Sequence, residues 1–182
     1  MFDFCPYDLW DITVPVTFVK NTIQMNVATV QLSEYEIERN KPMPSFNHGL
    51  VQGNLITLLN NIGKKRFDVV SELSLDLAAW PSVPDISVYP KKPYDAKNDI
   101  IKMPEPPICA IEILSPTQAF NDLIVKAIGY FDHGVKSCWI VLPALKNIYV
   151  FTNADDYEIY RTTDTLTDTA LDISFPVSEV FE

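Results

Sequence analysis

The segment Ile108-Cys-Ala-Ile-Glu-Ile-Leu114 is the most informative part of this 182-residue chain for its fold class. It is apolar at every position except Glu112, a pattern that is typical of a central strand with both faces buried. An ionised carboxylate in such a strand costs several kcal/mol unless it is paired, hydrogen-bonded or bound to a cation. Glu112 is therefore the first residue for which a function has to be sought.

The residues that follow this strand have the pattern of a helix start. Ser115 supplies a hydroxyl cap, a proline follows it directly, and Gln118 stands three residues after the serine. Thr117 and Asn121 are alternative caps for the same helix. We expect this helix to run to about Asp132, because a glycine lies two residues beyond.

Further elements are expected on both sides of this strand and helix. Upstream, apolar residues spaced by three and four predict a helix capped by Asn47 and ending near Gly63. Alternating apolar and polar residues predict one strand over 66–77, and the proline-rich segment 90–107 is expected to be a loop. The other expected elements are strands at 85–89, 137–142, 147–151, 157–161 and 170–173, one helical turn at 177–181, a strand-like segment at 12–32 and a strand or turn at 33–39.

This order of elements predicts an α/β domain with a mixed sheet flanked by helices and additional strands at both ends of the chain. A prior of about 150 residues per domain assigns 1–182 to a single domain. Residues 1–33 are expected to form an N-terminal extension or strands that pack on its core.

Composition limits the partners and the compartment. The chain has 14 Lys and Arg against 24 Asp and Glu, a net charge of −10, so it has no broad attraction for nucleic acid or an anionic membrane. Its three cysteines lack a CxxC spacing, which favours a reducing cytoplasm over a disulfide framework or a thiolate zinc site. Its apolar runs are far shorter than the roughly 20 residues of a membrane span, and no signal peptide is recognisable. We therefore expect a cytoplasmic protein without a membrane partner.

Several familiar catalytic patterns are absent from the sequence. GxGxxG, GxxxxGK[ST], HExxH and GxSxG do not occur, so dinucleotide, P-loop, zincin and hydrolase chemistry lack their signatures. The two histidines, His48 and His133, are far apart in the chain, which argues against a multi-histidine zinc site.

Carboxylates on neighbouring strands remain as candidates. Asp85 opens a short strand directly after Pro84, and Glu72 lies in the strand expected before it. Together with Glu112 they would meet at one edge of a sheet. Such oxygen ligands suit Mg²⁺ or Mn²⁺, which bind through a few carboxylates plus waters and substrate phosphates.

Lys126 has two interpretations. It stands four residues after Asp122 on the same helix face, where an exposed ion pair contributes about 0.3–0.5 kcal/mol. Alternatively, its ammonium reaches back to the strand end and orients a water or stabilises negative charge on a phosphate.

Taken together, the motifs of this sequence resemble the Uma family of restriction-endonuclease-like proteins. The resemblance extends from about residue 34 to the C-terminus. It is carried by Tyr35 to His48, Pro84-Asp85-Ile-Ser-Val88, Ile111-Glu-Ile-Leu-Ser-Pro-Thr117, Asp122 with Lys126 and Tyr130, Gly134-Val135, Cys138-Trp-Ile-Val141, and the tail Phe175 to Phe181.

The resemblance implies a PD-(D/E)xK nuclease core. In that scheme Asp85 and Glu112 hold a divalent metal, with the backbone carbonyl of Ile113 as a further ligand. Where the pattern requires Lys two residues after the Glu, this sequence has Leu114, and Lys126 is the candidate replacement.

The resemblance also implies roles around the metal. Glu72, His48 and Asp122 would lie beside the metal or serve a second one, although His48 can equally be a helix residue satisfied by the backbone. Ser115 and Gln118 would contact substrate, although as caps they need no such role.

The implied activity is Mg²⁺- or Mn²⁺-dependent hydrolysis of phosphodiester bonds in DNA, with a homodimer expected by analogy. Four lysines of the loop 90–107 are candidate DNA contacts, or else a solvated face.

Two alternatives remain: a catalytically degenerate module that binds or assembles, and a structural ion pair between Glu112 and Lys126 with Asp85 elsewhere. The nuclease interpretation requires the carboxylates and the lysine to converge on a pocket that solvent reaches.

Overall fold

The computed structural model describes residues 43–63 and 65–182. The strand-like segments expected at 12–32 and 33–39 lie outside these residues, as does the expected extension over 1–33. The assignment of the whole chain to one domain therefore stays a prediction, and the fold below is that of the described part.

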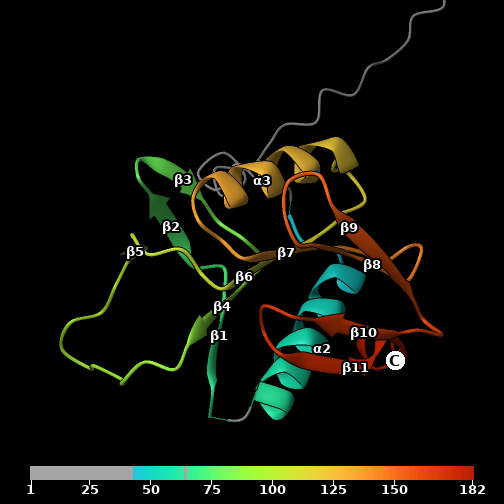
Figure 1. Cartoon of the computed structure of the whole chain (residues 1–182), viewed down its shortest axis with the longest axis horizontal. Helices are drawn as coiled ribbons and strands as arrows, with labels where there is room; N and C mark the ends of the chain where they lie inside the picture. Colours follow the sequence, from blue (N-terminus) through green and yellow to red (C-terminus); the bar gives the residue numbers. More distant parts are fainter. Residues whose placement is uncertain (1–42, 64) are drawn as a thin grey trace, which may run out of the picture. The chain divides into compact units, whose positions relative to one another are not determined.

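A six-stranded sheet forms the centre of the fold (Figure 1). Its strand order is β1-β4-β6-β7-β8-β9, and all neighbours are antiparallel except the parallel pair β6 and β7. The sheet is therefore mixed, as predicted. Its strands are β1 (Phe67–Ser71), β4 (Ile86–Pro90), β6 (Cys109–Ile113), β7 (Ser137–Leu142), β8 (Asn147–Phe151) and β9 (Tyr157–Arg161).

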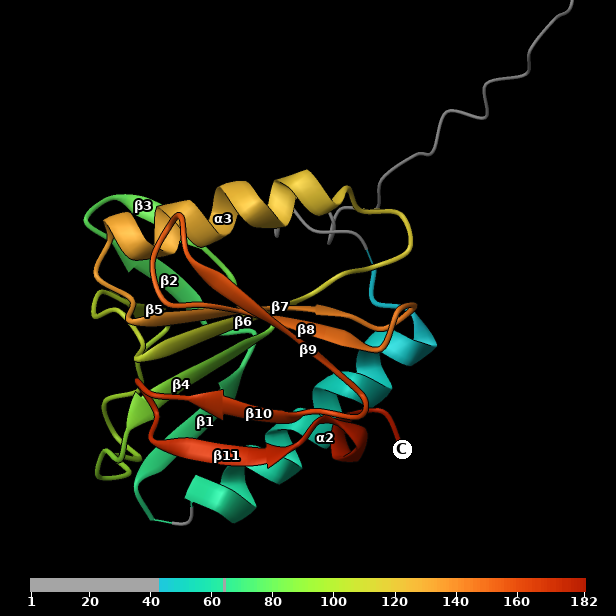
Figure 2. The ribbon, with the colours of Figure 1, turned by 45° about the vertical axis from the view of Figure 1, so that its right-hand side comes forward.

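Two helices cover opposite faces of this sheet, as Figure 2 shows. Helix α2 (Phe46–Gly63) buries Val51, Leu55 and Leu59 against one face. Helix α3 (Phe120–Asp132) buries Leu123 and Ala127, with Tyr130, against the other face. Spacings of three and four residues place each set on one side of its helix. Neither described helix is long and apolar enough to cross a bilayer.

The predicted helix caps are wrong. Helix α2 is capped by Ser45, whose hydroxyl oxygen accepts the backbone N–H of His48 at 3.3 Å, and Asn47 lies inside the helix. The residue before α3 is Ala119, which has no side-chain cap. Ser115 instead makes a separate turn, in which its carbonyl accepts the N–H of Gln118 at 3.0 Å. Several polar residues compete near each helix start, and tertiary packing selects the first helical residue.

The strand expected over 66–77 is broken at Glu72. That residue has a φ of 52°, and its N–H donates to the carbonyl of Asp85 at 3.1 Å. The chain thereby leaves the central sheet and enters a three-stranded sheet of order β3-β2-β5, which contains two strands that the sequence did not predict. Alternating side chains continue through the break, which explains why the pattern missed it. This sheet consists of β2 (Ser74–Leu77), β3 (Trp80–Ser82) and β5 (Lys102–Met103).

The C-terminal strand is also placed differently from the prediction. The segment 170–173 is mostly a turn, in which Asp168 Oδ1 accepts the N–H of Leu171 at 2.9 Å. On either side of the turn lie the paired strands β10 (Thr165–Asp168) and β11 (Ile173–Pro176), followed by the 3₁₀ turn η1 (Val177–Val180). The predicted helical turn is confirmed, and the strands at 137–142, 147–151 and 157–161 have the predicted bounds.

Two helical glycines give a matched pair of predictions about packing. A Cβ at Gly129 of α3 would clash with the indole of Trp80, whereas a Cβ at Gly53 of α2 would meet nothing within 4 Å. We expect Gly129→Ala to destabilise the fold by about 1–3 kcal/mol, because the ring must shift. Gly53→Ala should stabilise it by up to about 1 kcal/mol through helix propensity. Urea denaturation measures both, and a Gly129→Ala variant as stable as the parent would contradict the close contact.

Candidate active site

Asp85 lies at the entry to β4 and is buried, with 2% of its surface exposed. Its Oδ2 accepts the backbone N–H of Ile113 at 2.6 Å and lies 3.2 Å from Nε2 of His48. The side-chain amide of Gln52 donates to the Asp85 carbonyl at 2.9 Å. Helix α2 and strand β6 therefore hold this carboxylate in place together.

Glu112 is the central residue of the site and is 1% exposed. The ammonium of Lys126 lies 3.1 Å from Oε1 and 3.2 Å from Oε2, and the hydroxyl of Tyr130 donates to Oε1 at 2.6 Å. Both donors come from α3, four residues apart, so they project from the same helix face. The buried charge of Glu112 thus has the compensation that it needs.

The strand register explains why the two acids are neighbours. In the antiparallel pair β4 and β6, Ile86 is opposite Ile111, so Asp85 and Glu112 occupy the next positions along the two strands. The Asp85 carboxylate reaches the amide of Ile113, which belongs to the peptide that directly follows Glu112. The neighbouring strands therefore place Asp85 beside Glu112, and the adjacent helix places Lys126 at Glu112.

Tyr130 belongs to the motifs that resemble the Uma family, but the sequence alone predicts no role for it. Its hydroxyl bridges Glu112 and Ser82 of β3, with 2.8 Å to the serine oxygen. Burial, and then the adjacent Glu112 carboxylate, hold the pKa of Tyr130 well above its ordinary value, so it remains a proton donor. Its position four residues after Lys126 is the signal that identifies it.

We expect Tyr130→Phe to cost about 1–3 kcal/mol of stability, because Glu112 and Ser82 lose a buried partner. If Glu112 binds a metal, metal affinity should also fall by about 10- to 100-fold, the usual effect of losing a residue that orients a ligand. Tyr89→Phe is the matched control, since the Tyr89 hydroxyl binds the carbonyl of Glu105 outside the site. Urea denaturation and Mg²⁺ titration measure the two effects. An equal change in metal dependence for both variants would contradict the role of Tyr130.

His48 is 4% exposed, and its Nδ1 has no hydrogen-bond partner within 43–63 and 65–182. Its other ring nitrogen faces Asp85, so it contacts a candidate ligand rather than only its own helix. Glu72 reaches the site through its backbone N–H, which binds the Asp85 carbonyl, and its side chain is half-buried. Both residues therefore border Asp85.

The structure does not bring the remaining candidates to this cluster. Asp122 is exposed on the first turn of α3, and Lys126 pairs with Glu112 of β6 instead. Ser115 and Gln118 line a separate hollow of about 290 Å³, together with residues at the start of α2. They lie beyond the end of β6, on the chain segment that leads from Glu112 to α3.

The donors at this site suit a hard cation, although they do not form a complete cage. Within 43–63 and 65–182 no group of three or more His, Cys, Asp or Glu side chains is arranged to hold a metal. Mg²⁺, however, commonly uses one or two carboxylates and fills its other positions with water and phosphate. Asp85, Glu112 and Lys126 together carry one net negative charge. A cation at Glu112 would compete with the ammonium for the same two oxygens.

The cluster partly matches the structural alternative as well. That alternative predicts a direct contact between Glu112 and Lys126, which is present, and an Asp85 placed elsewhere, which is not observed. A purely structural ion pair does not explain why a second buried acid lies at the next peptide.

A model of the Uma2 family, described as "Putative restriction endonuclease", matches residues 28–178. The chain belongs to the Uma2 family. The resemblance noted in the sequence motifs is therefore confirmed, and it spans most of the chain.

The fold of this Uma2 protein is also found in a solved structure. A crystal structure described as that of "a putative nuclease belonging to DUF820" from Anabaena variabilis ATCC 29413 superposes with a TM-score of 0.68. The two chains are 22% identical, and the match covers 77% of this chain and 83% of the other. The predicted fold class is thereby confirmed. No curated protein matches the chain.

Proposed function

We propose that this Uma2 protein is a metal-dependent nuclease that hydrolyses phosphodiester bonds in DNA. The observation that carries the proposal is the pair of buried acids, Asp85 and Glu112, which flank one peptide of β6, with a lysine from α3 paired to Glu112. The descriptions of the family model and of the similar crystal structure support a nuclease.

Each residue of the cluster has a definite task in this proposal. Asp85 and Glu112 are the ligands for Mg²⁺ or Mn²⁺, and the carbonyl of Ile113 is a further candidate. A bound divalent ion supplies a Lewis acid for the phosphate and lowers the pKa of a coordinated water. His48 and the Ile113 amide keep Asp85 oriented, and Tyr130 does the same for Glu112. Lys126 neutralises charge on the phosphate or holds the attacking water.

The position of Lys126 accounts for the missing lysine at position 114, where this sequence has leucine. Side chains two residues apart on a strand share a face, so Leu114 follows Glu112 on the side of α3, where it is half-buried in the apolar cluster. Lys126 approaches the same side from the helix and places its ammonium at Glu112. In space, the helix lysine therefore substitutes for the missing strand lysine.

A cleavage assay tests the proposal directly. Purified protein is incubated with supercoiled plasmid, linear duplex and single-stranded DNA in Mg²⁺, in Mn²⁺ and in EDTA. We expect cleavage of at least one substrate with either metal and none in EDTA. No cleavage of any substrate under these conditions would refute the proposed activity.

One observation favours a second candidate, a binding or assembly module without turnover. Both carboxylate oxygens of Glu112 already have partners, so the site is satisfied without a metal. Thermal unfolding with added Mg²⁺ separates the candidates, because a ligand at 100 times its Kd stabilises the folded state by about 2.7 kcal/mol. The nuclease should be stabilised in a manner that Asp85→Asn abolishes, whereas the module should not respond.

Two further properties are part of the proposal. We place the protein in the cytoplasm, and the described cysteines, Cys109 and Cys138, fit a reducing compartment as free, buried thiols whose pKa burial raises. A homodimer is proposed by analogy, and light scattering on the purified chain measures the assembly state.

A further inference from the structure

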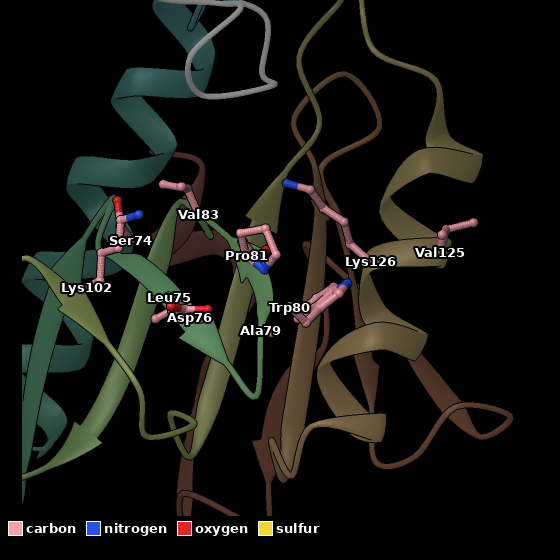
Figure 3. A pocket seen from close by; sticks show the side chains of 11 residues that line it. Ser74, Leu75, Asp76, Ala79, Trp80, Pro81, Val83, Lys102, Val125 and Lys126 are labelled. Carbon is pink, nitrogen blue, oxygen red and sulfur yellow. The ribbon is translucent and has the colours of Figure 1, made fainter.

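A groove of about 670 Å³ runs between β3 and α3, beside the Glu112 cluster. Figure 3 shows Lys126 of α3 extending toward Pro81 of β3, with the indole of Trp80 directed toward the helix. Lys102 of β5 also lines the groove. The volume is within the range of about 300–1,000 Å³ that small-ligand pockets have, enough for one or two nucleotides but not for a base-paired duplex.

The groove leads to the candidate active site through two residues. Lys126 lines the groove, and its ammonium is 3.1 Å from Glu112. Ser82 also lines the groove, and its hydroxyl is hydrogen-bonded to Tyr130, which in turn donates to Glu112. A phosphate bound beside Lys126 would therefore lie next to Glu112, whose own surface is almost entirely buried.

The charge of the groove differs from that of the chain. Two lysines and one carboxylate, Asp76, line it, whereas the chain as a whole carries −10. Two other lysines of the loop 90–107 have carboxylate partners, because Lys91 pairs with Asp68 and Lys92 pairs with Glu105. No ion pair among the described residues involves Lys102. Lys102 is thus the groove lysine with no ion-pair partner among the described residues, whereas Lys126 is shared with Glu112.

The wall formed by Trp80 is held in place. Its indole is stacked on His133, with ring centroids 4.8 Å apart, and meets Tyr130 edge to face at 5.2 Å. The absence of a side chain at Gly129 allows this close packing. The groove therefore has a pre-formed aromatic side beside its lysines.

We propose that this groove binds a single strand of nucleic acid, with Lys102 and Lys126 contacting successive phosphates. The inference rests on the proposed nuclease function and names the form of its substrate. Because only about two phosphates are neutralised, binding should be weakly salt-dependent, with a log–log slope near −1.4, from about −0.7 per contact. A protein that gripped a duplex along a broad basic face would show a much steeper slope.

Binding is tested on the full chain in EDTA, so that cleavage cannot interfere. The probe is a fluorescein-labelled oligothymidylate, compared with a duplex of equal length, and anisotropy is measured between about 50 and about 200 mM salt. We expect Lys102→Gln to weaken single-strand binding about 5- to 10-fold and to reduce the salt slope by about 0.7. Lys97→Gln, an exposed lysine of the same loop that does not line the groove, should change neither.

The outcomes separate this inference from the proposed function. Equal effects of Lys102→Gln and Lys97→Gln, or tighter binding of the duplex, would overturn the groove assignment even if cleavage depends on Asp85. Conversely, single-strand binding that depends on Lys102, with no cleavage in Mg²⁺ or Mn²⁺, would support the groove and refute the nuclease.

Discussion

Asp85→Asn and Glu112→Gln are each expected to lower metal-dependent cleavage by at least about 10²- to 10³-fold, the scale for losing a group that stabilises charge in a transition state. The two amides keep the size of the side chains and remove the negative charge that binds the cation. Both variants should also lose the Mg²⁺-induced rise in Tm, because each removes a proposed ligand. Initial rates and thermal unfolding on the same preparations measure the two effects.

Asp168→Asn is the matched control for these variants. Asp168 is also a buried acid, and its Oδ2 accepts hydrogen bonds from Ser137 at 2.6 Å and Trp139 at 2.7 Å, outside the Glu112 cluster. It should lower stability and leave the Mg²⁺ dependence of cleavage intact in the folded protein. If the two site variants behave in the same way as Asp168→Asn, these acids are structural and the nuclease proposal fails.

Lys126→Met is expected to lower the cleavage rate by about 10²-fold or more while metal affinity stays equal or rises. The rate falls because no ammonium remains to stabilise charge on the phosphate. Affinity does not fall, because the ammonium that competes for the Glu112 oxygens is gone. Breaking a fully buried ion pair costs about 3–5 kcal/mol, but the Lys126 side chain is 22% exposed, so a smaller loss of stability is expected.

A control and a rescue sharpen this test. Lys91→Met removes another lysine–carboxylate pair, with Asp68, and should leave cleavage unchanged. In the Lys126→Met background, Leu114→Lys puts an ammonium on the same face of β6 as Glu112 and should restore part of the rate. A Lys126→Met variant with full activity, or with weaker metal binding and a normal rate, would contradict the role assigned to this lysine.

Much of the site could be inferred from local sequence because its signals are local. Glu112 stands out as one acid in an apolar strand. Asp85 directly precedes β4, the strand that pairs with the strand of Glu112. The spacing between the strand and the helix is compatible with a contact between Lys126 and Glu112. It is equally compatible with an ion pair between Lys126 and Asp122 on the helix surface. Only the packing of α3 on the sheet decides this, since Lys126 is half-buried and contacts β6.

Other features depend on residues distant in the chain and have no local signal. At Glu72 the chain passes from β1 in the six-stranded sheet to β2 in the three-stranded sheet. The alternation of apolar and polar residues in the sequence continues through this break, so it does not reveal the change of sheet. The role of Tyr130 depends on Ser82, which is 48 positions away and belongs to the unpredicted strand β3. Likewise, the groove requires β3, β5 and α3 to meet, and a single segment does not contain it.

The amino-acid sequence is sufficient to predict the central strand, the two helices, the other strands of the six-stranded sheet, the family, and the two acids as candidates. Periodicity and composition are sufficient for this, because burial imposes them on each segment separately. Only the tertiary structure shows that the ammonium of Lys126 pairs with Glu112, that Tyr130 and His48 contact the two acids, and that a groove lies beside Lys126. These contacts join residues from separate helices and strands. Their distances depend on how the helices pack on the two faces of the sheet, which no single segment of sequence specifies.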